Sequence, residues 1–99
     1  MSYTVLFLTK ARKELAVGWS WYEEQKTGLG DRFLNVVMDK VSQIEKAPER
    51  YPKRFKNYHE AIIPVFPYLL IYRINKKKKS VVIVSVFHTR RNPAKKVRG

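Results

Sequence analysis

The chain has 99 residues and carries 21 Lys and Arg against 8 Asp and Glu, a formal net charge of +13. This length corresponds to one domain, spanning residues 1–99. Its 44% hydrophobic and 13% aromatic residues are too many for a disordered basic tail, and the absence of cysteine excludes disulfides and thiolate metal sites. No segment resembles a signal peptide or a membrane span. We therefore expect a cytoplasmic domain with an anionic partner.

The charge is divided unevenly along the chain. Residues 1–49 contain seven basic and seven acidic side chains, whereas residues 50–99 contain fourteen basic ones and the single acid Glu60. The first half is therefore neutral, and the second half holds the entire imbalance.

The first half predicts a strand and two helices. Residues 3–8 are β-branched and aromatic, which is typical of a strand. Apolar residues at three- and four-residue spacing predict amphipathic helices over 10–25 and from about 29 to 46. Gly28 suits a left-handed turn between them, and Pro48 disfavours helical geometry in the residue before it. Because the connection is short, the helices should form an antiparallel hairpin.

The second half predicts strands at 54–57, 60–63, 68–74 and 80–87, with a turn at 57–59. The last segment has hydrophobic residues on both faces and should lie in the interior of the sheet. The predicted fold class is α+β: an N-terminal strand and an antiparallel helical hairpin packed on a mainly antiparallel four- to five-stranded sheet. The hairpin should cover one face, and the other face or its rim should receive most of the basic side chains.

Three aromatic side chains can be placed from their positions in the sequence. Trp19 and Trp21 are two residues apart on a helix, so we expect one in the core and the other either exposed as a partner contact or packed under the 48–52 loop. His59 falls in the predicted turn and should face solvent. With two histidines far apart and no cysteine, we expect neither a metal site nor a cofactor.

Basic residues interleaved with aromatic ones predict a surface that binds the target or a nucleic acid, since cations hold phosphates and rings stack on bases. The lysine run 76–79 is better interpreted as a solvated turn that protects the sheet from edge aggregation. The candidate binding residues are Arg50, Lys53, Arg54, Lys56, Tyr72, Arg73, Lys95 and Lys96.

A second candidate group follows the last predicted strand. The His88 imidazole could act as a general acid or base, and Arg90 and Arg91 could stabilise a phosphorane. These three residues would be catalytic only if the protein is a nuclease. The equally weighted alternative is a structural histidine hydrogen-bonded at the end of a strand.

Several short motifs together resemble the RelE/ParE superfamily of toxins from bacterial type II toxin–antitoxin systems, closer to ParE and the plasmid stabilisation proteins. They occur in the family's order over nearly the whole chain. They are Ala11–Leu15, Trp21–Glu24, Gly28–Phe33, Pro48–Pro52, Phe66–Tyr68, Ile71–Ile74 and Val86–Pro93.

The resemblance implies an antitoxin partner, a small protein whose acidic or amphipathic tail wraps the toxin into a hetero-oligomer. It also implies one of two targets: the RelE branch cleaves mRNA in the ribosomal A site, whereas the ParE branch inhibits DNA gyrase. Leu69 stands where the nuclease branch has an arginine, and no tyrosine follows Tyr72 to match its C-terminal catalytic tyrosine. A register error of one or two residues would place Arg73 or Arg90 in the missing arginine's role.

Three hypotheses therefore remain open. The first is a ParE-like toxin that arrests growth by inhibiting DNA gyrase without enzymatic activity. The second is a RelE-like ribosome-dependent mRNA endonuclease. The third is a non-toxic basic module on the same fold that binds nucleic acid or protein.

Overall fold

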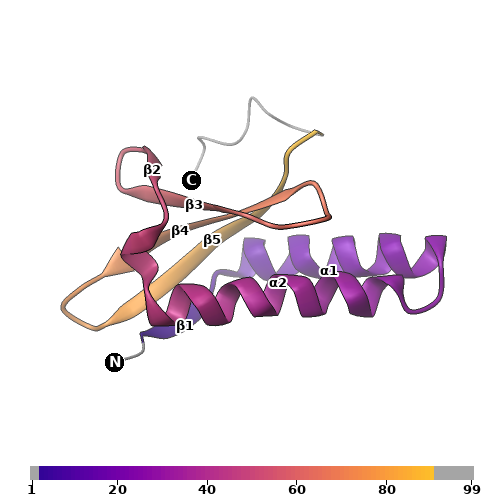
Figure 1. Ribbon diagram of the computed structural model, residues 1–99, viewed down its shortest axis with the longest axis horizontal. Helices are drawn as coiled ribbons and strands as arrows, with labels where there is room; N and C mark the ends of the chain where they lie inside the picture. Colours follow the sequence, from indigo (N-terminus) through magenta and orange to yellow (C-terminus); the bar gives the residue numbers. More distant parts are fainter. Residues whose placement is uncertain (1–2, 91–99) are drawn as a thin grey trace.

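The computed structural model describes residues 3–90 and contains every element predicted from the sequence. Two helices, α1 and α2, and a short 3-10 helix, η1, separate the first strand from the other four (Figure 1). The turn of the first hairpin lies at Lys56–Asn57, before the predicted turn, so β2 and β3 both begin earlier than expected. The bounds are β1 Thr4–Phe7, α1 Thr9–Gln25, α2 Leu29–Lys46, η1 Pro48–Arg50, β2 Lys53–Phe55, β3 Tyr58–Ile62, β4 Tyr68–Asn75 and β5 Ser80–His88.

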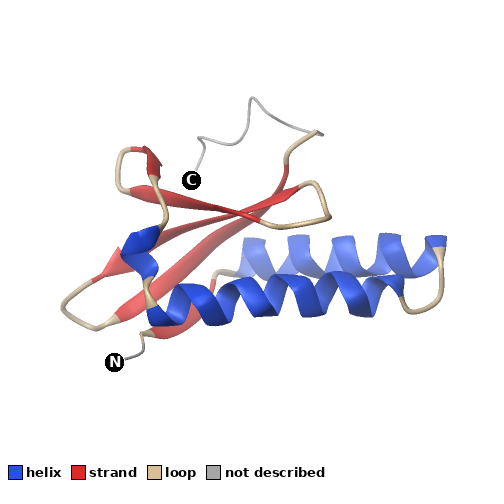
Figure 2. Cartoon of the chain, viewed as in Figure 1, coloured by secondary structure: helices blue, strands red, loops and turns tan. Residues whose placement is uncertain are grey.

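The five strands form one mixed sheet in the order β1-β5-β4-β3-β2. β1 pairs with β5 in parallel, and the other three pairings are antiparallel. β5 lies between β1 and β4, which confirms the interior position expected from its apolar faces. Both helices lie on the same side of the sheet (Figure 2), so the predicted α+β architecture is confirmed.

The helical hairpin is closed by a tight junction around Gly28. Gly28 adopts φ 92°, a left-handed conformation that glycine tolerates without a Cβ clash. The Glu23 carboxylate accepts hydrogen bonds from the backbone N–H groups of Gly28 and Gly30, both at 2.9 Å. The side chain at the end of α1 therefore satisfies backbone donors at the start of α2 that have no partner within the helix.

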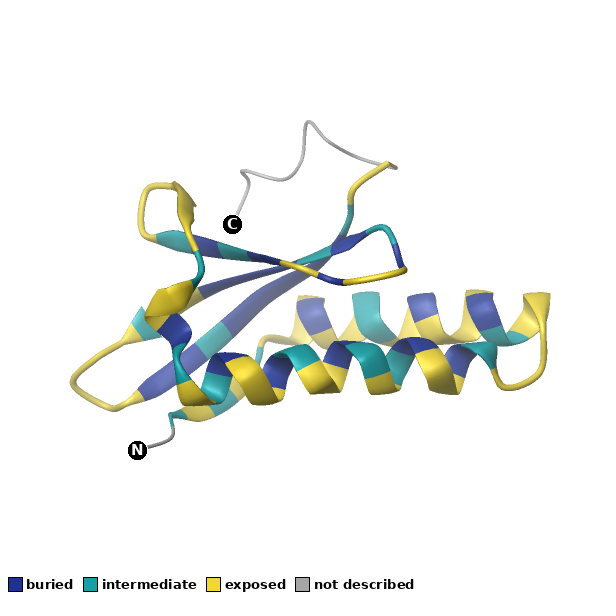
Figure 3. Cartoon of the chain, viewed as in Figure 1, coloured by how far each residue is buried: buried dark blue, intermediate teal, exposed yellow. Residues whose placement is uncertain are grey.

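The core lies between the hairpin and the sheet (Figure 3). Its centre is an aromatic cluster in which the Phe33 ring contacts Tyr22, Phe66 and Tyr68 at centroid distances of 5.1, 5.2 and 4.9 Å. Gly18 leaves room for this cluster, since a Cβ there would lie 2.9 Å from the Phe33 ring. The predicted helical stripe of Phe33, Val37, Val41 and Ile44 is buried, as its periodicity required.

The prediction for the two tryptophans was wrong. Trp19 is 37% exposed and Trp21 is 49% exposed, so neither belongs to the core. Tyr22 and Gly18 occupy the inward face of α1 instead, which leaves the tryptophans on its two flanks. The Trp19 indole N–H donates to Asp31 across the hairpin at 2.9 Å. Among residues 3–90, no helix has both the length and the apolar character needed to cross a membrane.

Candidate functional site

The face of the sheet that the helices leave uncovered, called the open face below, is apolar. A buried cluster of Ile71, Val84 and Phe87 lies there, with Tyr58, Leu69 and Val82 packed against it. This cluster is separate from the main core on the helical side. The open face therefore carries its own hydrophobic surface rather than the row of cations that a phosphate-binding sheet would need.

Exposed hydrophobic residues extend the open face towards both edges of the sheet. Ile62 is 69% exposed on β3, and Leu6 is 52% exposed on β1. Side chains alternate along a strand, so Glu60 and Arg73 share this face with Tyr58 and Ile71 respectively. They are the two charged side chains that β3, β4 and β5 place on it. The open face itself therefore holds few of the basic side chains.

The basic residues gather instead at the rim, as the alternative placement expected. The rim group consists of Arg50 at the end of η1, Lys53 and Arg54 on β2, and Lys56 in the following turn; all four are exposed. Lys76–Lys79 form the exposed turn between β4 and β5. In this turn, the Lys76 ammonium forms an ion pair with the Glu49 carboxylate at 3.5 Å. Side chains this exposed gain little stability from such a pair.

Tyr72 is placed differently from the prediction. It was a candidate for target binding, but its side chain is fully buried. Its hydroxyl donates to the Pro48 carbonyl at 2.5 Å, which ties β4 to η1. Burial, and to a lesser extent the nearby Tyr51 phenol, raise the pKa of Tyr72 above its ordinary range. Within this fold, Tyr72 is therefore a buried hydrogen-bond donor rather than an exposed side chain.

His59 was also placed wrongly, because it lies on β3 and is only 5% exposed. Its ring stacks on Tyr72 at 5.1 Å with an interplanar angle of 11°, and its Nδ1 lies 2.6 Å from the Tyr51 carbonyl oxygen. A carbonyl can only accept, so Nδ1 carries a proton. The early turn at Lys56–Asn57 causes the difference, since it brings His59 into the sheet opposite Tyr72 and Lys53.

His88 lies at the end of β5, as expected, with Arg90 two residues beyond it. The His88 Nδ1 accepts a hydrogen bond from the Arg90 backbone N–H at 3.2 Å, and its ring meets Tyr68 edge-on at 4.9 Å. These contacts fit the structural alternative weighed for His88. Arg91, Lys95 and Lys96 lie outside the described residues.

The structure does not bring the two predicted groups together. Lys53 lies in the row of Tyr72, whereas His88 pairs with Tyr68, four residues away along β4. This separation is about 13 Å along the strand alone, and two further strands lie between the groups. Arg73 is exposed on the open face between them. The rim group and His88 therefore lie too far apart to form one site.

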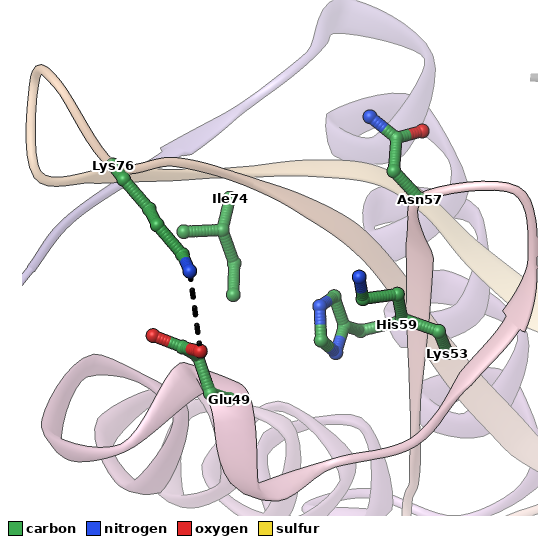
Figure 4. A pocket seen from close by; sticks show the side chains of 6 residues that line it. All are labelled: Glu49, Lys53, Asn57, His59, Ile74 and Lys76. Atoms are coloured by element: carbon green, nitrogen blue, oxygen red, sulfur yellow. Dashed lines mark ion pairs between the residues drawn. The ribbon is translucent and has the colours of Figure 1, made fainter.

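A small pocket of about 170 Å³ opens beside the rim group (Figure 4). Residues from η1, the β2–β3 hairpin and the end of β4 surround it. The buried His59 ring points into it. Within residues 3–90, no group of three or more acidic or histidine side chains is arranged to hold a metal ion. The lining residues are Glu49, Lys53, Asn57, His59, Ile74 and Lys76.

One further polar residue escaped the sequence analysis. β1 ends at Phe7, so none of the strands within residues 3–90 lies beside the second half of β5 on that edge. Glu14 on α1 covers this edge by accepting hydrogen bonds from the Ser85 hydroxyl at 2.8 Å and the Val86 N–H at 2.9 Å. A single acid in an amphipathic helix gives no signal of such a long-range contact.

Solved structures share this fold over most of the chain. The toxin–antitoxin complex RelBE2 of Mycobacterium tuberculosis matches with a TM-score of 0.67 and 28% identity, covering 89% of this chain and 99% of that one. The chromosomal ParDE system of P. aeruginosa matches with a TM-score of 0.76 and 11% identity, covering 88% and 96%. A RelE mutant of E. coli in the free state matches with a TM-score of 0.66 and 22% identity, covering 91% of this chain and 86% of that one.

A search of curated protein sequences finds no significant match. The profile of one family, described as the ParE toxin of type II toxin–antitoxin system parDE, matches residues 5–93. This match spans all eight elements of the structure except the first residue of β1. The chain therefore belongs to the ParE toxin family of type II toxin–antitoxin systems.

Proposed function

We propose that this toxin arrests growth by binding and inhibiting DNA gyrase in the cytoplasm, without catalysing a reaction. The observation that carries the proposal is the apolar open face, which lies on a toxin of the ParE family. The resemblance of the sequence to ParE implies gyrase as the target. Ile62 and Leu6 expose apolar surface at the margins of its buried cluster, and exposed apolar surface on a small domain is typical of a protein-binding site.

The chemistry of the open face favours a protein over RNA as the target. RNA cleavage needs cations around the scissile phosphate together with a general acid and base. Leu69 lies on this face where the nuclease branch has an arginine, and its neighbours Ile71 and Phe87 are also apolar. Aromatic and aliphatic groups with few charges are instead typical of the centre of a protein–protein interface.

A RelE-like mRNA endonuclease is the second candidate. It is favoured by the adjacency of His88 and Arg90 at the end of β5, where the imidazole and a cation lie two residues apart. In this mechanism, His88 would transfer the proton while Arg90 and Arg91 stabilise charge on the phosphorus. Their action would require a rearrangement that frees the His88 Nδ1 from the Arg90 backbone.

We further propose that an antitoxin holds the protein in an inactive hetero-oligomer. Structures of related toxins are described as ParDE and RelBE toxin–antitoxin complexes. The net charge of +13 favours an acidic segment in such a partner. Binding across the rim group should weaken as salt increases, because exposed charge pairs are screened. Salt-insensitive binding would place the contact on apolar surfaces instead.

Two assays on the purified protein distinguish the targets. In the first, DNA gyrase supercoils a relaxed plasmid in the presence of increasing toxin. In the second, a translating extract is probed for cleaved message. We expect inhibition of supercoiling and intact mRNA. In induced cells, trouble with DNA synthesis should precede the loss of protein synthesis.

The variants His88→Ala and Arg90→Ala control for the alternative. If mRNA is cleaved and either substitution abolishes the cleavage, the nuclease assignment replaces the gyrase proposal. If mRNA is cleaved and neither substitution has an effect, the catalytic site lies elsewhere. Normal growth on induction without antitoxin, together with unimpaired gyrase, would support the non-toxic binding module.

A further inference from the structure

The pocket at His59 lies on a row of side chains that crosses three neighbouring strands. Lys53, His59 and Tyr72 are direct cross-strand partners in one row, with Lys53 opposite His59 and His59 opposite Tyr72. Direct partners place their side chains about 5 Å apart on the same face. The row runs from the buried Tyr72 through the nearly buried His59 to the exposed Lys53 at the edge of the sheet.

The orientation of the His59 ring is fixed from two sides. Stacking on Tyr72 holds its plane, and the 2.6 Å contact with the Tyr51 carbonyl holds its Nδ1. Tyr72 is itself held by its hydrogen bond to Pro48. Figure 4 shows the ring pointing towards Glu49 and Lys76 across the pocket.

The charges around the pocket favour an anionic guest. Lys53 and Lys76 contribute two cations, and Glu49 contributes one anion that pairs with Lys76 at 3.5 Å. Asn57 adds an amide that can donate. The local surplus is therefore one positive charge. A single carboxylate group would balance this surplus without leaving an unpaired charge in a partly enclosed site.

The remaining wall of the pocket favours a carboxylate on an aliphatic stem. Ile74 is half-buried, packs against the main core and also lines the pocket. It offers apolar contact to methylene groups beside the cationic groups. The volume of about 170 Å³ is also small, which suits a single side chain better than a nucleotide.

We propose that this pocket binds one carboxylate side chain from an acidic segment of a protein partner, with Lys53, Lys76 and Asn57 as donors around the His59 ring. The identity of the partner as an antitoxin rests on the proposed function, but the carboxylate site does not. The charged groups that line the pocket with His59 are Glu49, Lys53 and Lys76.

The test uses glutarate as the probe and follows the ring resonances of His59 by NMR at constant ionic strength. The chain has two histidines, so His88 serves as the internal reference. We expect saturable movement of the His59 signals, with those of His88 unchanged. The absence of saturable movement of His59 would overturn the proposal. Inorganic phosphate binding more tightly than glutarate would also overturn it, in favour of a phosphate site.

Variants then separate a binding role from a structural one. Lys53→Gln, at an exposed position, should weaken glutarate binding about tenfold, the value of one charge-assisted hydrogen bond. Lys77→Gln, in the basic turn but outside the pocket, should leave it unchanged. Glu49→Gln should strengthen binding several-fold, because it removes the competing carboxylate. A loss of affinity in Glu49→Gln, or equal losses in both lysine variants, would contradict the assignment.

These results are independent of the toxin assays. Glutarate binding in a protein that does not inhibit gyrase would retain the carboxylate site and reject the proposed target. Inhibition of gyrase by a protein that does not bind glutarate would do the reverse.

Discussion

The two faces of the sheet are both apolar, but they differ in what covers them. The helical side carries the main core under α1 and α2. On the open face, only a small cluster around Ile71, Val84 and Phe87 is buried, and Ile62 and Leu6 remain exposed at its margins. The first face stabilises the fold, and the second is available to a partner. The basic rim group therefore lies at the edge of the apolar open face and not on the face itself.

The sharpest test of this comparison uses two adjacent leucines on β4. Leu70 is fully buried on the helical side, whereas Leu69 is half-buried on the open face. Leu70→Ala should lower the free energy of unfolding by about 2–5 kcal/mol, and Leu69→Ala by less than about 2 kcal/mol. Urea denaturation of both variants measures the difference. Equal losses would mean that the open face is packed as tightly as the core.

A second test disturbs the packing between α1 and α2, the two helices that cover the helical side of the sheet. A Cβ at Gly30 would lie 2.5 Å from the Trp19 carbonyl oxygen, which belongs to the backbone of α1 and cannot turn away. Gly30→Ala should therefore destabilise the protein by about 1–3 kcal/mol despite the better helix propensity of alanine. Asn35→Ala, at an exposed position of α2, is the matched control and should be neutral or stabilising in thermal unfolding.

A third test concerns the buried hydroxyl at the edge of the helical side. Tyr72→Phe removes the hydrogen bond to Pro48 and should cost about 1 kcal/mol at pH 7. Because the folded pKa of Tyr72 is raised, the unfolded chain releases this proton first, at about pH 10. The wild type should therefore lose stability by about 1.4 kcal/mol per pH unit above pH 10 from this group, and the variant should lack that contribution. Parallel denaturation curves from pH 8 to 11 measure it.

The smallest effect on stability should accompany the largest effect on function. Ile62 is 69% exposed on the open face, so Ile62→Glu should change the free energy of unfolding by less than about 0.5 kcal/mol. It should nevertheless abolish growth arrest, since a charge at the margin of an apolar interface must be desolvated. Lys77→Glu is the control for the added negative charge. Unchanged toxicity of Ile62→Glu would remove the open face from target binding.

The elements were predictable because their signals are local. The three- and four-residue spacing of Phe33, Val37 and Val41 fixes one face of a helix without reference to the rest of the chain. Hydrophobic residues on both faces of β5 likewise predict a strand in the interior of the sheet. The structure places β5 between β1 and β4. The turn of the first hairpin was less predictable. Because it lies earlier than expected, at Lys56–Asn57, His59 falls on β3 and not in the turn.

The sequence by itself determined the order of elements, the neutral first half and basic second half, and the family. Only the tertiary structure decided which side chains meet. Cross-strand register placed Tyr72 and His59 in one buried row beside Lys53, whereas the composition had grouped Tyr72 with the exposed cations. Burial and pairing depend on neighbours that are distant in sequence, such as Glu14 with Val86. A one-residue change of register moves a side chain to the opposite face.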